Sequence, residues 1–181
     1  MHAAYLTDIR RTFRNYRSLA DRALAQVSDD QFVQLPGSQD NSLAVIVQHV
    51  AGNLRSRFTD FLTADGEKPD RDRDREFEQP ASADRTALMT SWQTAWDTVL
   101  AQLDALTPED LERTVHIRTE PFLVFEALNR SATHTAYHVG QIVFVARHLA
   151  GTGFTSLSIP KGRSAEFGIG TFKQGPVPRP R

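Results

Sequence analysis

The sequence predicts an all-α protein built from four long helices, and two observations carry this prediction. Four segments repeat apolar residues every three or four positions, which is the spacing of one helix face. The polar–apolar alternation that is typical of a strand is confined to residues 113–118, so only minor short strands are expected. A chain of 181 residues can bury roughly 70% of its unfolded surface. We expect a single domain over residues 1–172 and a disordered, proline-rich tail over residues 173–181.

The first two long helices follow from their apolar faces and caps. One helix is expected over residues 7–26, and the capping-box pattern Ser28-Asp29-Asp30-Gln31 predicts a short helical turn after it. Residues 36–40 form a loop, and Ser42 then caps a helix over residues 43–62. The apolar face of the first helix is Leu6, Ile9, Phe13, Tyr16, Leu19 and Leu24. The apolar face of the second is Leu43, Ile46, Val47, Val50, Leu54, Phe58 and Phe61.

A polar crossover is expected between the second and third long helices. Residues 65–69 indicate a turn, and residues 70–76 alternate Asp with Arg before ending in Glu. We expect this stretch to be a solvated loop. Phosphate binding by its arginines is the alternative, which the interleaved aspartates oppose. The third helix is expected from residue 82 or 84 to residue 106, with Trp92 and Trp96 in the core.

The last long helix is expected from near Pro121 to a C-terminal cap at Gly151. Before it, Thr107-Pro108 has the pattern of a helix start. The strand-like run 113–118 follows, and its His116 is expected to be exposed. The apolar face of the last helix is Phe125, Leu128, Ala132, Val139, Ile142, Val143 and Ala146.

Composition excludes several classes of partner and site. The net charge is −1, which gives no electrostatic reason to expect nucleic acid or an anionic membrane. No apolar run approaches the roughly 20 residues that span a bilayer, and the N-terminus lacks the pattern of a signal peptide, so we expect a cytoplasmic location. There is no cysteine, so a metal would be held by nitrogen and oxygen.

Two histidines of the last helix, His134 and His138, are spaced to reach one metal ion. Residues at i and i+4 lie on one helix face, one turn apart. His49, on the second long helix, is the third candidate, whereas His148 faces away. All three candidates lie at the border between the apolar face and solvent, so we expect them at the lip of a groove. The alternative is that they are ordinary satisfied or solvent-facing histidines.

Three imidazoles with a vacant position form the ligand set of a catalytic metal rather than a structural one. The catalytic group itself is then expected to be a metal-bound water or a metal-bound thiolate. No glutamate follows His134, so the metalloprotease motif H-E-x-x-H is absent. Asn53, Arg130, Tyr137 and Gln141 are candidates for the wall of a substrate pocket, with structural roles as the alternative.

Two glycines, Gly52 and Gly140, lie inside the expected helices close to these ligands. Each costs about 1 kcal/mol relative to alanine in a helix. Close helix approach or room for a ligand is one explanation, and ordinary tight packing is the other.

Five segments that span most of the chain match the pattern of a known family. They are residues 46–63 (IVQHVAGNLRSRFTDFLT), 65–69 (DGEKP), 73–78 (RDREFE), 134–142 (HTAYHVGQI) and 159–162 (IPKG). On these residues the chain resembles the DinB/YfiT-like superfamily, and within it a bacterial branch that is known only as a domain of unknown function.

The resemblance implies a four-helix bundle with an up-down-down-up course and a long crossover between helices two and three. It also implies one divalent metal per chain, zinc or nickel, held by His49, His134 and His138. Characterised relatives include transferases that use low-molecular-weight thiols such as bacillithiol and mycothiol, and a maleylpyruvate isomerase; members are often homodimers.

The sequence therefore predicts a metal-binding protein that transfers a low-molecular-weight thiol to a small molecule. Metal-dependent hydrolysis of a small molecule is one alternative. A non-catalytic, metal-stabilised interaction module is the other.

Overall fold

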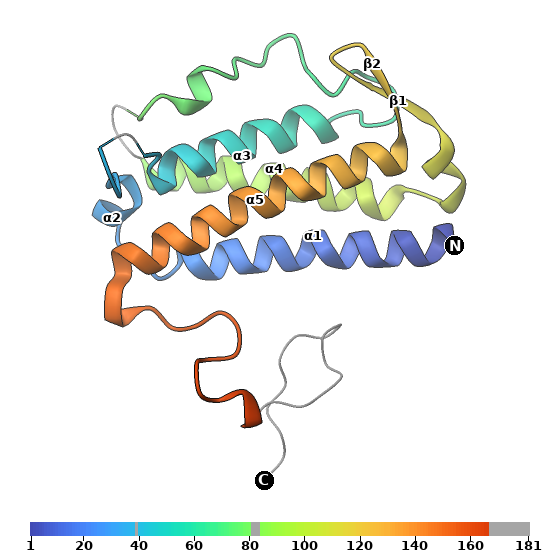
Figure 1. Ribbon diagram of the computed structural model, residues 1–181. Coiled ribbons are helices and arrows are strands. Elements are labelled where there is room, and N and C mark those ends of the chain that lie inside the picture. The colour runs from blue at the N-terminus through green and yellow to red at the C-terminus, as the bar shows by residue number, and fades with distance from the viewer. Residues whose placement is uncertain (39, 81–83, 167–181) are drawn as a thin grey trace.

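The protein is mostly helical, with one small two-stranded sheet (Figure 1). The computed structural model describes residues 1–38, 40–80 and 84–166. Its α-helices are α1 (His2–Leu24), α2 (Asp29–Val33), α3 (Leu43–Phe58), α4 (Arg85–Ala105) and α5 (Val124–Ala150). The strands are β1 (Thr114–Ile117) and β2 (Glu120–Leu123), and short 3-10 helices lie at Arg75–Phe77, Pro108–Glu112, Gly151–Gly153 and Ser164–Glu166.

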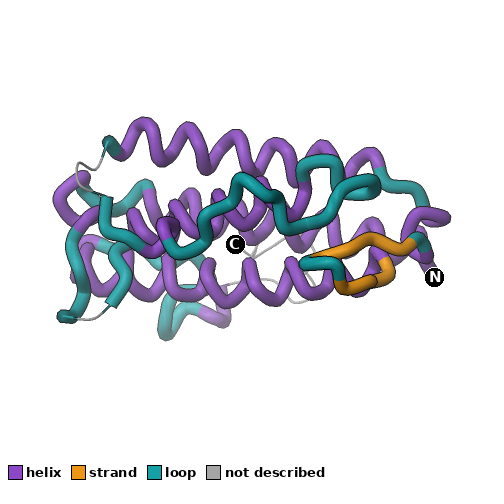
Figure 2. The backbone as a smooth tube through the Cα atoms, turned by 90° about the horizontal axis from the view of Figure 1, so that it is seen from above, coloured by secondary structure: helices purple, strands orange, loops and turns teal. Residues whose placement is uncertain are grey.

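Four long helices lie side by side. Helices α1 and α5 run in one direction and α3 and α4 in the other, as the colours of Figure 1 show. Helix α3 packs against α4 and α5, and α1 packs against α4 and α5. The connection from α3 to α4, here called the crossover (residues 59–80), runs back along the length of the helices (Figure 2). It therefore returns the chain to the end from which α3 started.

The core between these helices is built from large aromatic and aliphatic side chains. Trp92 and Trp96 of α4 are fully buried, as expected from their positions on the apolar face. The ring of Phe13 makes edge contacts with the rings of Phe58 and Trp96, at distances of 5.7 Å and 6.4 Å between ring centroids. These contacts join α1, α3 and α4, so the core already fixes the backbone of the helix that carries His49.

The start of α1 and the end of α3 differ from the sequence prediction. Helix α1 begins at His2 and not near residue 7, because Leu6 is buried and the Tyr5 hydroxyl donates a hydrogen bond of 2.8 Å to Asn129 Oδ1 on α5. Helix α3 ends at Phe58 and not at residue 62. Asp60 has a φ of 50°, which a right-handed helix cannot accommodate, and the chain turns there.

The strand-like run forms β1, but the sequence prediction missed its partner. Strand β2 pairs with β1 in antiparallel register, from Thr114 opposite Leu123 to Ile117 opposite Glu120. The two turn residues, Arg118 and Thr119, both have positive φ, 56° and 65°, as a tight hairpin of this type requires. Helix α5 consequently begins at Val124 and not near residue 121.

Asp65, in the crossover, holds this hairpin turn in place. Its carboxylate accepts hydrogen bonds from the backbone N–H of Arg118 at 2.9 Å and of Thr119 at 2.7 Å. These bonds stabilise a backbone conformation that neither residue prefers by itself. Because no glycine or asparagine stands in the turn, the usual sequence signal for such a hairpin is missing.

The expectation that residues 70–76 are solvated is confirmed for Asp70 and for residues 72–75, which are exposed, and is wrong for Arg71 and Glu76. The side chain of Arg71 is only 3% exposed and that of Glu76 only 9%, because the two pair with each other over α3.

The exposed positions expected for His116 and His148 are confirmed. The tail 173–181 and the alternative helix start at residue 82 lie outside the described residues, and the single domain over residues 1–172 stays a prediction. In the described part of the chain, no helix is both long enough and apolar enough to cross a membrane.

Candidate metal centre

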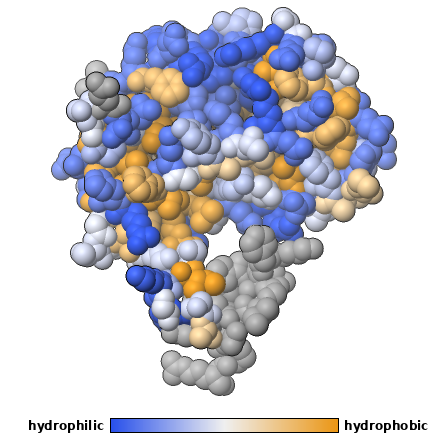
Figure 3. All heavy atoms as spheres, viewed as in Figure 1, coloured by the Kyte–Doolittle hydropathy of each residue, from blue (hydrophilic) through white to orange (hydrophobic). Residues whose placement is uncertain are grey.

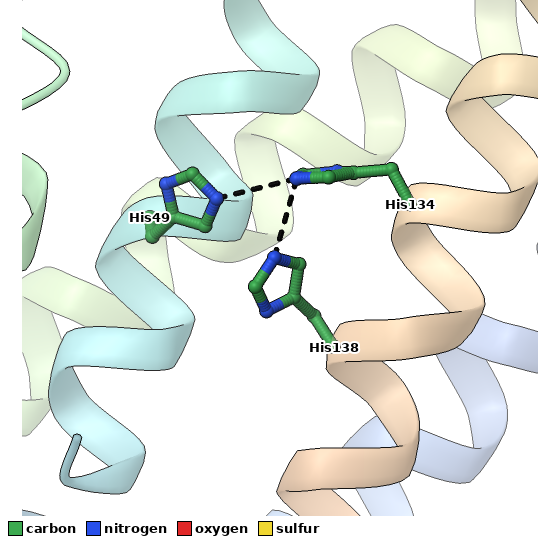
Figure 4. Close-up of side chains that lie close together, drawn as sticks. All are labelled: His49, His134 and His138. Carbon is green, nitrogen blue, oxygen red and sulfur yellow. Dashed lines mark hydrogen bonds between the residues drawn. The ribbon is translucent and has the colours of Figure 1, made fainter. Parts of the chain in front are cut away.

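The three candidate histidines meet between α3 and α5 (Figure 4). His134 Nε2 lies 3.3 Å from His49 Nε2 and 3.2 Å from His138 Nε2. One nitrogen of each ring can be chosen so that all three lie within 4.8 Å of one another. Among the described residues, no other group of three or more histidines, aspartates or glutamates is spaced to hold a metal ion.

The local structure explains why these rings converge. His134 and His138 are one turn apart on α5, so both project from the same side of that helix. His49 lies on the side of α3 that packs against α5. Close packing of two long helices therefore brings together nitrogens from residues that are 85 positions apart in the chain.

The partner of His49 determines which of its nitrogens faces the centre. His49 Nδ1 lies 2.9 Å from Glu76 Oε2. Burial raises the pKa of the Glu76 carboxyl, but hydrogen bonds from Arg71 and His49 outweigh burial and hold that pKa below its usual value. An ionised carboxylate can only accept, so His49 Nδ1 donates. In a neutral ring, Nε2 then carries a lone pair that points toward the other two histidines.

His138 is oriented in the same way by a residue of its own helix. Its Nδ1 donates to Gln141 Oε1 at 2.7 Å. The Nε2 lone pair of His138 consequently also faces the centre. A second partner on the far nitrogen of a ligating histidine is the usual arrangement at protein metal sites.

The donor set fits a divalent metal. Two inward lone pairs, on His49 and His138, approach the Nε2 of His134, and one proton on that nitrogen can satisfy only one of them at a time. A cation at the centre would satisfy all three nitrogens at once. Burial, followed by the neighbouring imidazoles, lowers the pKa of His134 to about 4. Burial also lowers the pKa of His138. Both rings are therefore neutral at pH 7, the form in which imidazole binds metals.

The centre is more deeply buried than the sequence predicted. His49 is 3% exposed and His138 is 8% exposed, and only His134 is half-buried. The crossover covers His49, because the centroid of the Phe77 ring lies 4.4 Å from the centroid of the imidazole. The angular position of a residue on its helix cannot reveal a cover that comes from another segment, so the expected place at a groove lip is corrected.

The crossover is held over α3 by a buried ion pair. Arg71 donates to both oxygens of Glu76, from Nε to Oε1 at 2.8 Å and from Nη2 to Oε2 at 2.8 Å. Gly52 makes room for this pair, because a Cβ at that position would collide with the Glu76 carboxylate. The glycine was the one sequence signal that could have pointed to Glu76. Gly140 has no such role, since a Cβ there would meet nothing within 4 Å.

A second carboxylate, Glu67, gathers three arginines beside this pair. Glu67 lies 2.9 Å from Arg57, 3.3 Å from Arg71 and 3.2 Å from Arg118. Burial raises the pKa of Glu67, but the hydrogen bond from Arg57 and the charges of the three arginines outweigh it and hold that pKa below its usual value. The hairpin, α3 and the crossover are thereby joined by one network of charges.

A cavity of about 660 Å³ opens beside the histidines, which is the size range of small-molecule sites. All four candidates for its wall, Asn53, Arg130, Tyr137 and Gln141, line it. Tyr137 is 65% exposed and stands at the rim. Sequence reasoning missed the crossover and hairpin residues of the wall. They are Arg71, Arg73, Phe77 and Arg118. Figure 3 shows hydrophilic residues around a recess in the upper part of the molecule.

Comparison with known proteins places the chain in a family. A search of the curated proteins finds no match. Residues 1–163, which comprise nearly all of the described chain, match the family that is described as protein of unknown function, DUF1572. The chain belongs to the DUF1572 family.

Proposed function

We propose that the protein is a metal-dependent enzyme that transfers a low-molecular-weight thiol to a small molecule. The observation that carries the proposal is the convergence of three imidazole nitrogens beside a cavity of small-molecule size. His49, His134 and His138 would hold one divalent metal, zinc or nickel, since imidazole suits both. A metal bound there would act as a Lewis acid and favour the thiolate form of a substrate thiol.

Other residues of the chain orient the metal ligands and exclude water from the centre. Glu76 and Gln141 orient two of the ligands through their Nδ1 atoms. Phe77 covers His49 and excludes water from that side of the centre. In the transfer, the thiol gives its proton to solvent, its sulfur forms a bond to an electrophilic carbon of the second substrate, and the leaving group departs with the bonding electrons.

The lining of the cavity favours thiol transfer over hydrolysis. Among its described lining residues there is no Asp or Glu. The nearby carboxylate, Glu76, is buried and engaged by Arg71 and His49. Activation of water commonly uses a carboxylate base within hydrogen-bond reach. A metal lowers the pKa of bound water as well as that of a bound thiol. A thiol, however, starts from a pKa of about 8.5 and needs the smaller shift to ionise at pH 7. A cavity without a carboxylate base therefore suits a thiol nucleophile better.

The finer assignment of fold and family belongs to the same proposal. The helix directions and the long connection after α3 support an up-down-down-up four-helix bundle of the DinB/YfiT-like type. That assignment brings with it a homodimer, and the cytoplasmic location expected from the N-terminal sequence is part of the same proposal. Size-exclusion chromatography with light scattering tests the oligomeric state.

Metal content is the first test. Elemental analysis of purified protein should give about one divalent metal per chain, and His138→Ala should lose most of it. Equal metal content in the two proteins would refute the assignment of the ligands.

Turnover is the second test. The protein is assayed with a panel of thiols and electrophiles, and with a panel of hydrolysable esters and amides, each with added metal and with chelator. Thiol conjugation that chelator abolishes supports the proposal. Turnover confined to the esters and amides points to hydrolysis, and a metal-loaded protein without turnover points to an interaction module.

A further inference from the structure

Five arginines line the cavity beside the histidines, and among its described lining residues no carboxylate accompanies them. They are Arg57, Arg71, Arg73, Arg118 and Arg130. The whole chain has a net charge of −1, so this concentration of positive charge does not follow from composition. Low-dielectric walls strengthen the field of such a cluster, which favours an anion inside it.

Three of the five arginines are largely occupied by structural carboxylates. Glu67 contacts Arg57, Arg71 and Arg118, and Glu76 binds Arg71 through both of its oxygens. The carboxylate of Asp65 lies beside the same arginines: burial raises its pKa, but backbone N–H hydrogen bonds, that of Arg118 among them, and the charge of Arg57 hold that pKa below its usual value. Arg73 and Arg130 are therefore the two arginines of the cavity that these structural carboxylates do not engage.

Arg73 and Arg130 are held differently from the other three arginines. The guanidinium of Arg73 lies over the Phe77 ring at 5.0 Å, and that of Arg130 lies over the Phe122 ring at 5.7 Å. Stacking occupies the face of a guanidinium and leaves the N–H groups at its edge free to bind a ligand. Arg73 also lies 3.6 Å from Asp74, but that carboxylate is 96% exposed and the pair is screened by water. Among the described residues, no carboxylate forms an ion pair with Arg130.

Both arginines lie close to the candidate metal centre. The Phe77 ring contacts both the His49 ring and the Arg73 guanidinium. Only this phenyl ring therefore separates Arg73 from His49, one of the proposed metal ligands. Arg130 precedes His134 by one helical turn on α5 and lines the same cavity. A molecule that contacts the histidines is therefore within reach of cationic groups on two sides.

We propose that the cavity binds a small organic anion through a carboxylate or phosphate group, with Arg73 and Arg130 as the anion-binding residues. Planar guanidinium groups suit both kinds of oxyanion, because they offer two parallel N–H donors. The inference rests on the proposed function in that it names the charge class of the substrate of that site.

Binding is tested on metal-free protein, so that the anion cannot bind to a metal instead. Isothermal titration at fixed ionic strength uses succinate and inorganic phosphate, with succinamide as the uncharged counterpart of succinate. We expect at least one anion to bind about tenfold tighter than succinamide, and Arg130→Gln to weaken it about tenfold, since a charge-assisted hydrogen bond contributes on that scale. The tighter of the two anions identifies the preferred oxyanion.

Matched variants complete the test. Arg130→Lys keeps the charge but not the paired donors, and should bind with an affinity between wild type and Arg130→Gln. Arg22→Gln removes an exposed arginine from α1, which contributes no residue to the cavity, and should bind like wild type. Circular dichroism melts confirm that each variant folds.

Two results would overturn the inference: both anions bind no tighter than succinamide, or the double variant Arg73→Gln, Arg130→Gln binds the anion as wild type does. Metal content is measured separately, on the protein as purified and before any metal is removed for the titration. A protein that binds the anion but holds no metal would refute the metal-dependent function and leave the anion site standing. A metal-loaded protein without anion preference would refute the anion site and leave the metal-dependent function standing.

Discussion

The Glu76→Gln substitution tests whether the crossover orients the metal centre. Glu76 accepts three hydrogen bonds, one from His49 Nδ1 and two from Arg71. The amide of glutamine has one oxygen and one NH2 group in the places of the two carboxylate oxygens. Wherever the oxygen lies, the NH2 group faces at least one N–H of Arg71 or His49. The variant therefore loses at least one charge-assisted bond and the charge that balances Arg71.

The expected cost follows from these contacts. Loss of one hydrogen bond to a buried charged group destabilises the fold by about 2–3 kcal/mol. The full cost of an unpaired buried charge is not expected, because Glu67 still lies 3.3 Å from Arg71. In a domain of this size, that free energy lowers the melting temperature by about 4–12 °C. Zinc affinity should fall by about 10- to 100-fold, as is typical when the second partner of a ligating histidine is lost.

The assay compares this variant with Glu67→Gln. Glu67 belongs to the same charge network but contacts no histidine, so its replacement should lower stability without a comparable loss of zinc affinity. Zinc affinity is measured by competition with a chromophoric chelator, and stability by thermal melts of metal-free protein. Wild-type zinc affinity in Glu76→Gln, or an equal loss in Glu67→Gln, would refute the reasoning.

Three further predictions concern the same centre. His49→Ala should lose the metal yet keep its helical circular dichroism spectrum and a cooperative melt; unfolding of the wild type by chelator alone would contradict this. Gly52→Ala should weaken zinc binding and lower the melting temperature, because its Cβ would displace the Glu76 carboxylate, whereas Gly140→Ala meets open space and should gain up to about 1 kcal/mol of helix stability. In metal-free protein, the lowered pKa of His134, about 4, means that the unfolded chain binds a proton between pH 6.5 and 4 that the folded chain does not. The free energy of unfolding should therefore decrease as pH falls through that range, and urea melts should show a smaller decrease in His134→Gln.

Local patterns in the sequence were enough to predict which segments are helices and which histidines form the candidate metal centre. The apolar faces predicted α3, α4 and α5 to within a few residues, and the i, i+4 spacing placed His134 and His138 on one side of α5. Such patterns are readable because a helix repeats every 3.6 residues whatever its neighbours are. The capping box at Ser28 was predictable for the same reason, since its bonds join residues only three positions apart.

Tertiary contacts alone decided the hairpin and the cover of the site. The turn at Arg118 and Thr119 is stabilised by Asp65, 53 and 54 positions earlier, so its own residues give no sign of it. The alternating charges of the crossover look solvated when read in isolation. Burial of Arg71 and Glu76 depends on each being neutralised and on the space above Gly52, which is available only when the crossover lies on α3. A charged side chain is buried where its partners lie close in space, and those partners come from segments that a local pattern does not connect.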